Sequence, residues 1–133
     1  MRVFRLCKKA FVALDGEGAK MYGGRWNFRG LPIVYTSNTL SLAMLEMLVH
    51  IEVELAPEGL VCLDIEIPET VQIEFIALPP GYSKSKNEVL LKETGSEWLR
   101  ENRTAVLKVP SVIVPSEYNF LINPLHPQAK KIH

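Results

Sequence analysis

The clearest alternation of apolar and polar residues ends the stretch over residues 60–67 and recurs through residues 71–76. A two-residue period of this kind predicts strands with one solvated face. Shorter β-branched and aromatic runs predict further strands at residues 3–6, 33–36, 105–109 and 118–124. Because the strands come in runs with few helices between them, the pattern indicates the α+β class with mixed sheets, and not a regular βαβ alternation.

Residues 40–51 are predicted to form a buried helix, because their apolar side chains recur with helical spacing and cover most of the circumference. The run is preceded by residues that are each suited to cap a helix, namely Ser37, Asn38 and Thr39. Glu46 lies in the middle of this helix, and a buried carboxylate is costly unless it is paired, hydrogen-bonded or facing a polar cavity. A local pair of Glu46 with His50, four residues on, is the structural alternative. The helix pattern leaves both interpretations open.

Glycine and polar residues mark the expected boundaries in the second half of the chain. Gly95 is expected to separate a short helical turn at residues 88–92 from a helix over residues 96–103. The polar tail after residue 124 is expected to be peripheral. No internal repeat and no linker interrupts the sequence, so residues 1–133 are predicted to form a single domain.

Composition and charge exclude several classes of protein. The chain is 47% hydrophobic and 23% charged, which is typical of a globular domain and not of a disordered one. Lysine plus arginine equals aspartate plus glutamate at 15 each, which disfavours nucleic acid or an anionic membrane as a direct partner. Cys7 and Cys62 are far apart and near no histidine motif, as is typical of reduced thiols. With neither a secretory signal nor an apolar stretch long enough to span a bilayer, we expect a soluble cytoplasmic protein.

The stretch from Gly23 to Asn27, Gly-Gly-Arg-Trp-Asn, is the most informative motif. Paired glycines ahead of Arg25 allow unusual backbone conformations and the close approach of a ligand, although a plain surface turn has the same appearance. Tyr35 follows ten residues after Arg25, and Glu46 eleven residues after Tyr35. A guanidinium, a phenol and a carboxylate therefore arrive on a turn, a strand and a helix. No metal site and no Rossmann motif is predicted, because ligand spacing and a Gly-x-Gly-x-x-Gly sequence are both missing.

Five segments, taken together and in order, resemble the RES domain family, which is named for an arginine, a glutamate and a serine. They are Gly-Gly-Arg-Trp-Asn, Val-Tyr-Thr-Ser, Leu-Ala-Met-Leu-Glu, Val-Pro-Ser and Tyr-Asn-Phe-Leu-Ile-Asn-Pro. The resemblance covers nearly the whole chain. It implies a fold similar to the ADP-ribosyltransferases of the diphtheria-toxin type. It also implies a bacterial toxin that consumes NAD and is silenced by an Xre-type antitoxin with a helix-turn-helix domain, and a homodimer is compatible with the family.

By this resemblance, the active-site positions of the family fall on Arg5, Arg25, Tyr35, Glu46, Ser111 and Asn119. Glu46, Arg25 and Ser111 are expected to be catalytic. Arg5, Tyr35 and Asn119, together with Arg25 and Ser111, are expected to bind NAD, and no cofactor beyond this substrate is implied. Ser116 is a second candidate for the family's serine.

These residue types suit cleavage of the nicotinamide–ribose bond. The reaction develops positive charge on the ribose, which a carboxylate such as Glu46 can stabilise. The planar fork of an arginine suits the pyrophosphate, and the ring of Tyr35 can stack on nicotinamide. Water, phosphate or a protein remains open as the acceptor. Two other functions also remain open: an ADP-ribosyltransferase that modifies a protein, and a non-catalytic partner-binding domain in which Arg25 and Glu46 form a structural salt bridge.

Overall fold

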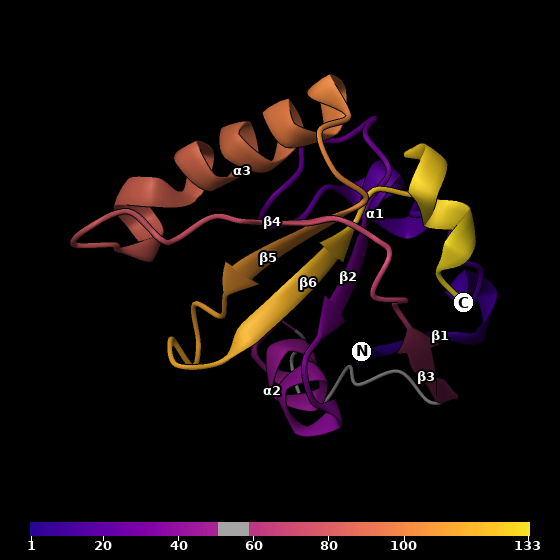
Figure 1. Ribbon diagram of the computed structural model, residues 1–133. Coiled ribbons are helices and arrows are strands. Elements are labelled where there is room, and N and C mark those ends of the chain that lie inside the picture. Colours follow the sequence, from indigo (N-terminus) through magenta and orange to yellow (C-terminus); the bar gives the residue numbers. More distant parts are fainter. Residues whose placement is uncertain (51–58) are drawn as a thin grey trace.

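In the computed structural model, which describes residues 1–50 and 59–133, six strands form one mixed sheet in the order β3-β1-β2-β6-β5-β4 (Figure 1). The strands are β1 (Arg2–Lys8), β2 (Val34–Ser37), β3 (Leu60–Glu66), β4 (Ile73–Phe75), β5 (Val106–Pro110) and β6 (Tyr118–Ile122). Within this sheet β4 and β5 are parallel, and the other neighbours are antiparallel. The predicted α+β class with a mixed sheet is confirmed.

The helices border different parts of this sheet (Figure 1). They are α1 (Glu17–Tyr22), α2 (Leu40–His50) and α3 (Lys84–Glu101), with short 3₁₀ helices at Lys9–Phe11 and Pro127–Lys131. α2 contacts β1 and β2, whereas α3 runs along the opposite side of the molecule (Figure 1). In the described ranges no helix combines the length and apolarity needed to cross a bilayer.

Alternate residues of the central strands enter two separate hydrophobic clusters, one on each face of the sheet. Leu107 and Leu121 pack with Trp98 of α3 on one face. Val106, the neighbour of Leu107, packs with Ile132 on the other face. This is the two-residue period expected of a strand buried on both sides. The cluster on the α3 face also contains Trp26 and partly buried Tyr35, so this layer supports the residues of the Gly-Gly-Arg-Trp-Asn motif.

The prediction of two helical segments separated by Gly95 is wrong, because α3 is continuous and Gly95 lies inside it. The helix begins after Ser83, whose side chain accepts a hydrogen bond from the backbone N–H of Lys86. A Cβ atom on Gly95 would lie 1.9 Å from the carbonyl oxygen of Trp26. Glycine therefore occupies this position because α3 packs directly against another segment, and not because the helix ends there.

The predicted burial of α2 is also wrong for most of its apolar residues. Leu42 and Ala43 are buried, while several larger side chains are exposed, namely Leu40, Met44, Leu45, Leu48 and Val49. Apolar residues all around a helix show which side chains would be stabilised by burial. They do not show which of these side chains are packed against other parts of this chain. The predicted last residue of the helix, Ile51, lies outside the described residues.

The C-terminal tail is not peripheral, contrary to the prediction. The side chain of Ile132 is buried in the cluster on the face opposite α3. His133 and Glu66 exchange two backbone hydrogen bonds, with N···O distances of 2.7 and 3.2 Å. The tail therefore contributes both to the core and to the pairing of the sheet.

Candidate active site

A cavity of about 690 Å³ lies between α1, α2, α3 and the strands β1, β2 and β6. Its volume falls within the roughly 300–1,000 Å³ that is typical of small-molecule sites. Most of the residues predicted for the site line this cavity, namely Arg5, Arg25, Tyr35, Glu46 and Asn119. Ser111 is fully buried and reaches the cavity through its contact with Glu46. The structure therefore brings together the six residues that the resemblance marked for the site, whereas Ser116, the second candidate serine, does not line the cavity.

The carboxylate of Glu46 is held by three other side chains. Its Oε1 accepts hydrogen bonds from Ser111 Oγ at 2.6 Å and from Asn119 Nδ2 at 2.9 Å. Its Oε2 lies 3.4 Å from Nη1 of Arg25, and the side chains of this ion pair are only 15% and 13% exposed. A largely buried carboxylate needs such donors. Glu46 is thus fixed in orientation at the wall of the cavity.

Ser111 follows β5 and has one well-defined hydroxyl orientation. Its Oγ accepts hydrogen bonds from the backbone N–H groups of Ile113 at 3.1 Å and Val114 at 3.0 Å. Because these donors occupy the lone pairs, the hydroxyl proton is directed at Glu46. Ser116 is exposed, so Ser111 is the serine that the structure places beside the carboxylate.

Tyr35 ties the loop that carries Arg25 to strand β2. Its hydroxyl accepts a hydrogen bond from the backbone N–H of Trp26 at 2.9 Å and donates one to Oδ1 of Asn27 at 2.6 Å. Gly24 lies so close that a Cβ atom there would be 2.7 Å from the phenol oxygen. Burial raises the pKa of the Tyr35 phenol well above its usual range, while the hydrogen bond from Trp26 and the charge of Arg25 oppose this shift. Tyr35 is therefore a neutral support at physiological pH.

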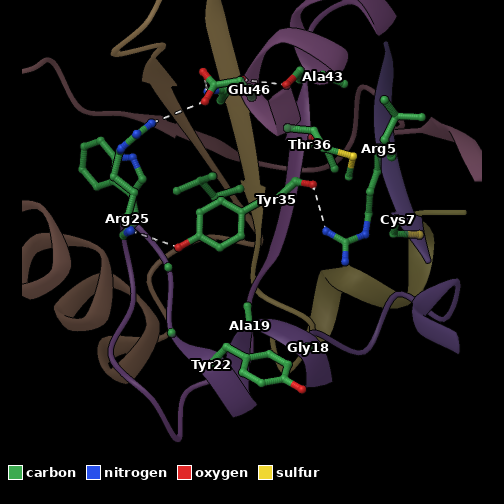
Figure 2. A pocket seen from close by; sticks show the side chains of 18 of the residues that line it. Arg5, Cys7, Gly18, Ala19, Tyr22, Arg25, Tyr35, Thr36, Ala43 and Glu46 are labelled. Carbon is green, nitrogen blue, oxygen red and sulfur yellow. Dashed lines mark hydrogen bonds and ion pairs between the residues drawn. The ribbon is translucent and has the colours of Figure 1, made fainter. Parts of the chain in front are cut away.

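Arg5 of β1 brings a second guanidinium to the cavity. Its Nη1 donates a hydrogen bond to the carbonyl oxygen of Tyr35 at 3.2 Å. Its Nε is buried and has no hydrogen-bond partner among the described residues. Figure 2 shows Arg5 and Arg25 on opposite sides of the Tyr35 ring, with the guanidinium of Arg25 pointing towards Glu46. Arg5 also lines the cavity, where the charge of its guanidinium suits an anionic ligand.

The sequence did not reveal the part that Ser37 takes in this site. Its Oγ donates a hydrogen bond to Oδ1 of Asn119 at 2.8 Å, which turns the amide nitrogen of Asn119 towards Glu46. By residue type, Ser37 is only one of three possible helix caps. The cap is Thr39, whose hydroxyl oxygen accepts a hydrogen bond from the N–H of Leu42 at 3.1 Å. The contact between Ser37 and Asn119 spans 82 residues, and no local pattern signals it.

Two further residues support the loop that carries Arg25. Asn27 is fully buried, and its side-chain nitrogen donates to three backbone oxygens, those of Ala19, Phe28 and Leu31. The motif contained Asn27, but its role as the centre of the loop had no signal in the sequence. Lys92 of α3 donates a hydrogen bond to the carbonyl oxygen of Gly24 at 2.6 Å. It was not predicted at all.

Two sequence predictions stay predictions. Over the residues that the structure describes, no group of three or more histidine, cysteine, aspartate or glutamate side chains could hold a metal ion. The helix pattern left open a pairing of Glu46 with His50, and the side chain of His50 lies outside the described part of the structure. The described partners of Glu46 are Arg25, Ser111 and Asn119.

The chain is similar to proteins that are named as toxins. A family model described as the RES domain matches residues 2–133. The "Prs ADP-ribosylating toxin" of Sphingobium sp. is 43% identical over 124 residues, covering 90% of this chain and 77% of that protein. The "Toxin Res" of Photorhabdus laumondii is 39% identical over 138 residues, covering 100% and 86%. A chain from the crystal structure of the M. tuberculosis MbcT–MbcA toxin–antitoxin complex has the same fold, with a TM-score of 0.72, 18% identity, and coverage of 91% of this chain and 72% of that one.

Proposed function

The chain belongs to the RES domain family, and we propose that it is the toxin of a bacterial type II toxin–antitoxin pair that cleaves the nicotinamide–ribose bond of NAD. The names of the relatives and the crystallised toxin–antitoxin complex support the role of a toxin. The observation that supports the chemistry is the meeting of Arg25 and Glu46 in one cavity of suitable volume. Such an enzyme would act in the cytoplasm, where NAD is present.

Glu46 is the residue that suits the developing charge. Cleavage of the bond to nicotinamide builds positive charge on the ribose, as in other glycosidic cleavage. A preorganised carboxylate in a cavity with little water stabilises that charge more strongly than water does. Ser111 and Asn119 set its orientation before substrate arrives. Nicotinamide leaves as a neutral molecule, so no strong general acid is required, and no histidine is among the described residues lining the cavity.

The two arginines suit the pyrophosphate of NAD. Arg5 lines the cavity together with Arg25, and the charge of its guanidinium suits a phosphate oxygen. Arg25 lies 3.4 Å from Glu46, farther than the roughly 2.7–2.9 Å of a tight charge-assisted hydrogen bond. Arg25 also lines the cavity, which suits an arginine that binds substrate as well as Glu46. Tyr35 lines the same cavity, where its ring is available to nicotinamide.

The second candidate function is ADP-ribosylation of a protein. The name of the relative from Sphingobium, which is 43% identical, favours it. Both reactions begin with the same bond cleavage, and they differ in the group that receives the ADP-ribosyl unit. Hydrolysis gives free ADP-ribose and phosphorolysis gives its phosphate, whereas a transferase leaves label from [³²P]NAD on protein. The products therefore separate the three acceptors.

The deciding experiment is incubation of the purified protein with NAD and measurement of released nicotinamide. We expect release by the parental protein and its loss in Glu46→Gln, because the amide keeps the shape of the side chain but removes its negative charge. The matched control is Glu93→Gln, at an exposed position of α3, which should keep the parental rate. Parental release by Glu46→Gln would show that this carboxylate does not catalyse the reaction. If the parental protein released no nicotinamide, a non-catalytic domain would be favoured.

The family relation also supports a protein partner. We propose that an Xre-type antitoxin closes the cavity and that contact with DNA is made by this partner and not by the toxin. The exposed apolar side chains of α2 belong to the helix that carries Glu46, so a protein that buries them would lie beside the cavity. A homodimer on the same helix is the competing arrangement. Light scattering distinguishes the two arrangements when it is applied to the chain alone and with the antitoxin, for the parent and for Leu48→Glu. A complex with the antitoxin that is lost in the variant supports binding of the antitoxin at α2. A dimer formed by the chain alone supports the homodimer.

A further inference from the structure

The loop that presents Arg25 is a short turn anchored at both ends. The backbone N–H of Gly24 donates to the carbonyl oxygen of Asn27 at 3.1 Å, which closes the turn with Arg25 and Trp26 at its tip. On the side of β2, the Tyr35 hydroxyl contacts the backbone of Trp26 and the side chain of Asn27. These contacts fix the loop relative to the sheet. They do not fix it relative to the wall that α3 forms.

A single face of α3 supplies the anchors on the other side. Lys92 Nζ donates to the carbonyl oxygen of Gly24 at 2.6 Å, and the Oγ of fully buried Ser96 accepts from the N–H of Phe28 at 3.1 Å. Between them, Gly95 lies against the carbonyl oxygen of Trp26 and leaves no room for a side chain. Residues 92, 95 and 96 are three and four apart, so they share one face of the helix.

From this geometry we infer that Lys92 is a positioning residue for Arg25, acting through the carbonyl oxygen of Gly24 next to it in the chain. This inference rests on the proposed function. A catalytic group misplaced by about 1 Å costs on the order of 100-fold in rate, so an anchor one residue from Arg25 has a direct effect on catalysis. Lys92 also lines the cavity, where contact with the substrate itself is the competing explanation.

A double-mutant cycle separates these two explanations. Lys92→Met removes the donor but keeps the length of the side chain, and it is expected to lower kcat/KM for NAD about 10-fold. In the Arg25→Lys background, which has already lost the planar fork, Lys92→Met should have little further effect because it acts through residue 25. Lys92→Arg should restore most of the rate, since it returns a cationic donor. Lys86→Met, the same substitution at an exposed position of α3, should leave the rate unchanged.

Backbone hydrogen exchange supplies a readout that needs no activity. In Lys92→Met, the amides of Trp26 and Phe28 should exchange at least about 10-fold faster, while those of the core strand β5 should not change. If Lys92→Met and Arg25→Lys lowered kcat/KM independently, so that their fold-changes multiplied in the double variant, the inference would be overturned. Unchanged hydrogen exchange of the loop amides would overturn it as well. If the parental protein released no nicotinamide, the proposed function would fail, and the exchange rates would still decide whether Lys92 positions the loop.

Discussion

The two oxygens of the Glu46 carboxylate have different surroundings. Neutral donors from Ser111 and Asn119 satisfy Oε1, whereas Oε2 lies beside the charge of Arg25. Ser37 in turn fixes the amide of Asn119. Because Oε1 is already satisfied, Oε2 is the oxygen that suits a developing cation or a ribose hydroxyl. The direction of the carboxylate is thus set by small polar residues from three different segments of the chain.

Tyr35 leads to a prediction on the pH dependence of stability. Burial raises the pKa of its phenol in the folded state. The stabilisation that Tyr35 gives to the folded protein is therefore complete below the unfolded pKa of about 10, and it is lost as pH rises above that value. Tyr35→Phe removes the hydroxyl that satisfies Trp26, which should cost about 1–3 kcal/mol at pH 8. The stability difference between parent and variant should shrink above pH 10, by up to about 1.4 kcal/mol per pH unit.

Urea unfolding of both proteins at pH 8 and at pH 10.5 would measure this difference. Tyr22→Phe is the control, because Tyr22 is 68% exposed and its stability difference should be near zero at either pH. A gap between the parent and Tyr35→Phe that stayed constant across the two pH values would show that the phenol does not remain protonated in the folded protein.

At the scale of elements, the packing of α3 against the Arg25 loop reverses a general rule for helices. Alanine is normally about 1 kcal/mol more favourable than glycine inside a helix. At Gly95, however, a Cβ atom would lie 1.9 Å from the carbonyl oxygen of Trp26, so α3 or the loop must move. We expect Gly95→Ala to lower the free energy of unfolding by about 1–3 kcal/mol. Thermal or urea unfolding measures this change.

Gly18→Ala in α1 is the matched comparison. A Cβ atom there would meet its nearest neighbour, a ring carbon of Phe11, at 3.4 Å. The same substitution should therefore be neutral or slightly stabilising at Gly18. A stabilising effect at Gly95 as well would mean that α3 does not pack on the loop as the structure has it.

The strands were predictable because their pattern is local. The strands predicted over residues 60–67 and 105–109 match β3 (Leu60–Glu66) and β5 (Val106–Pro110) within a residue or so. The continuity of α3 was not predictable in the same way. In a sequence, a glycine that ends a helix looks the same as a glycine inside a helix that packs closely against another backbone. Only the contact of Gly95 with Trp26 in the structure distinguishes the two cases.

In the whole molecule, the side chains that meet in the cavity were easier to predict from the sequence than the residues that support them. Arg25, Tyr35 and Glu46 lie within 22 residues, and the spacing of a turn, a strand and a helix made their meeting foreseeable. The contact of Lys92 with Gly24 spans 68 residues and depends on how α3 crosses the sheet, which no periodicity encodes. The exposure of α2 depends on what covers it, so its apolar pattern could not decide burial within this chain.

The division of the core into two faces allows stability and catalysis to be separated. Ile132 is 7% exposed in the cluster opposite α3, whereas Trp26 and Tyr35 belong to the cluster that supports the site. Ile132→Ala should lower the free energy of unfolding by about 2–5 kcal/mol, while Ile73→Ala, at a position 41% exposed, should change it by about 0.5 kcal/mol or less. Below the melting temperature, kcat/KM for NAD should equal the parental value in both variants. A loss of activity in folded Ile132→Ala would show that the sheet transmits changes on one face to the residues on the other, and the site would then depend on the C-terminal segment as well as on α3.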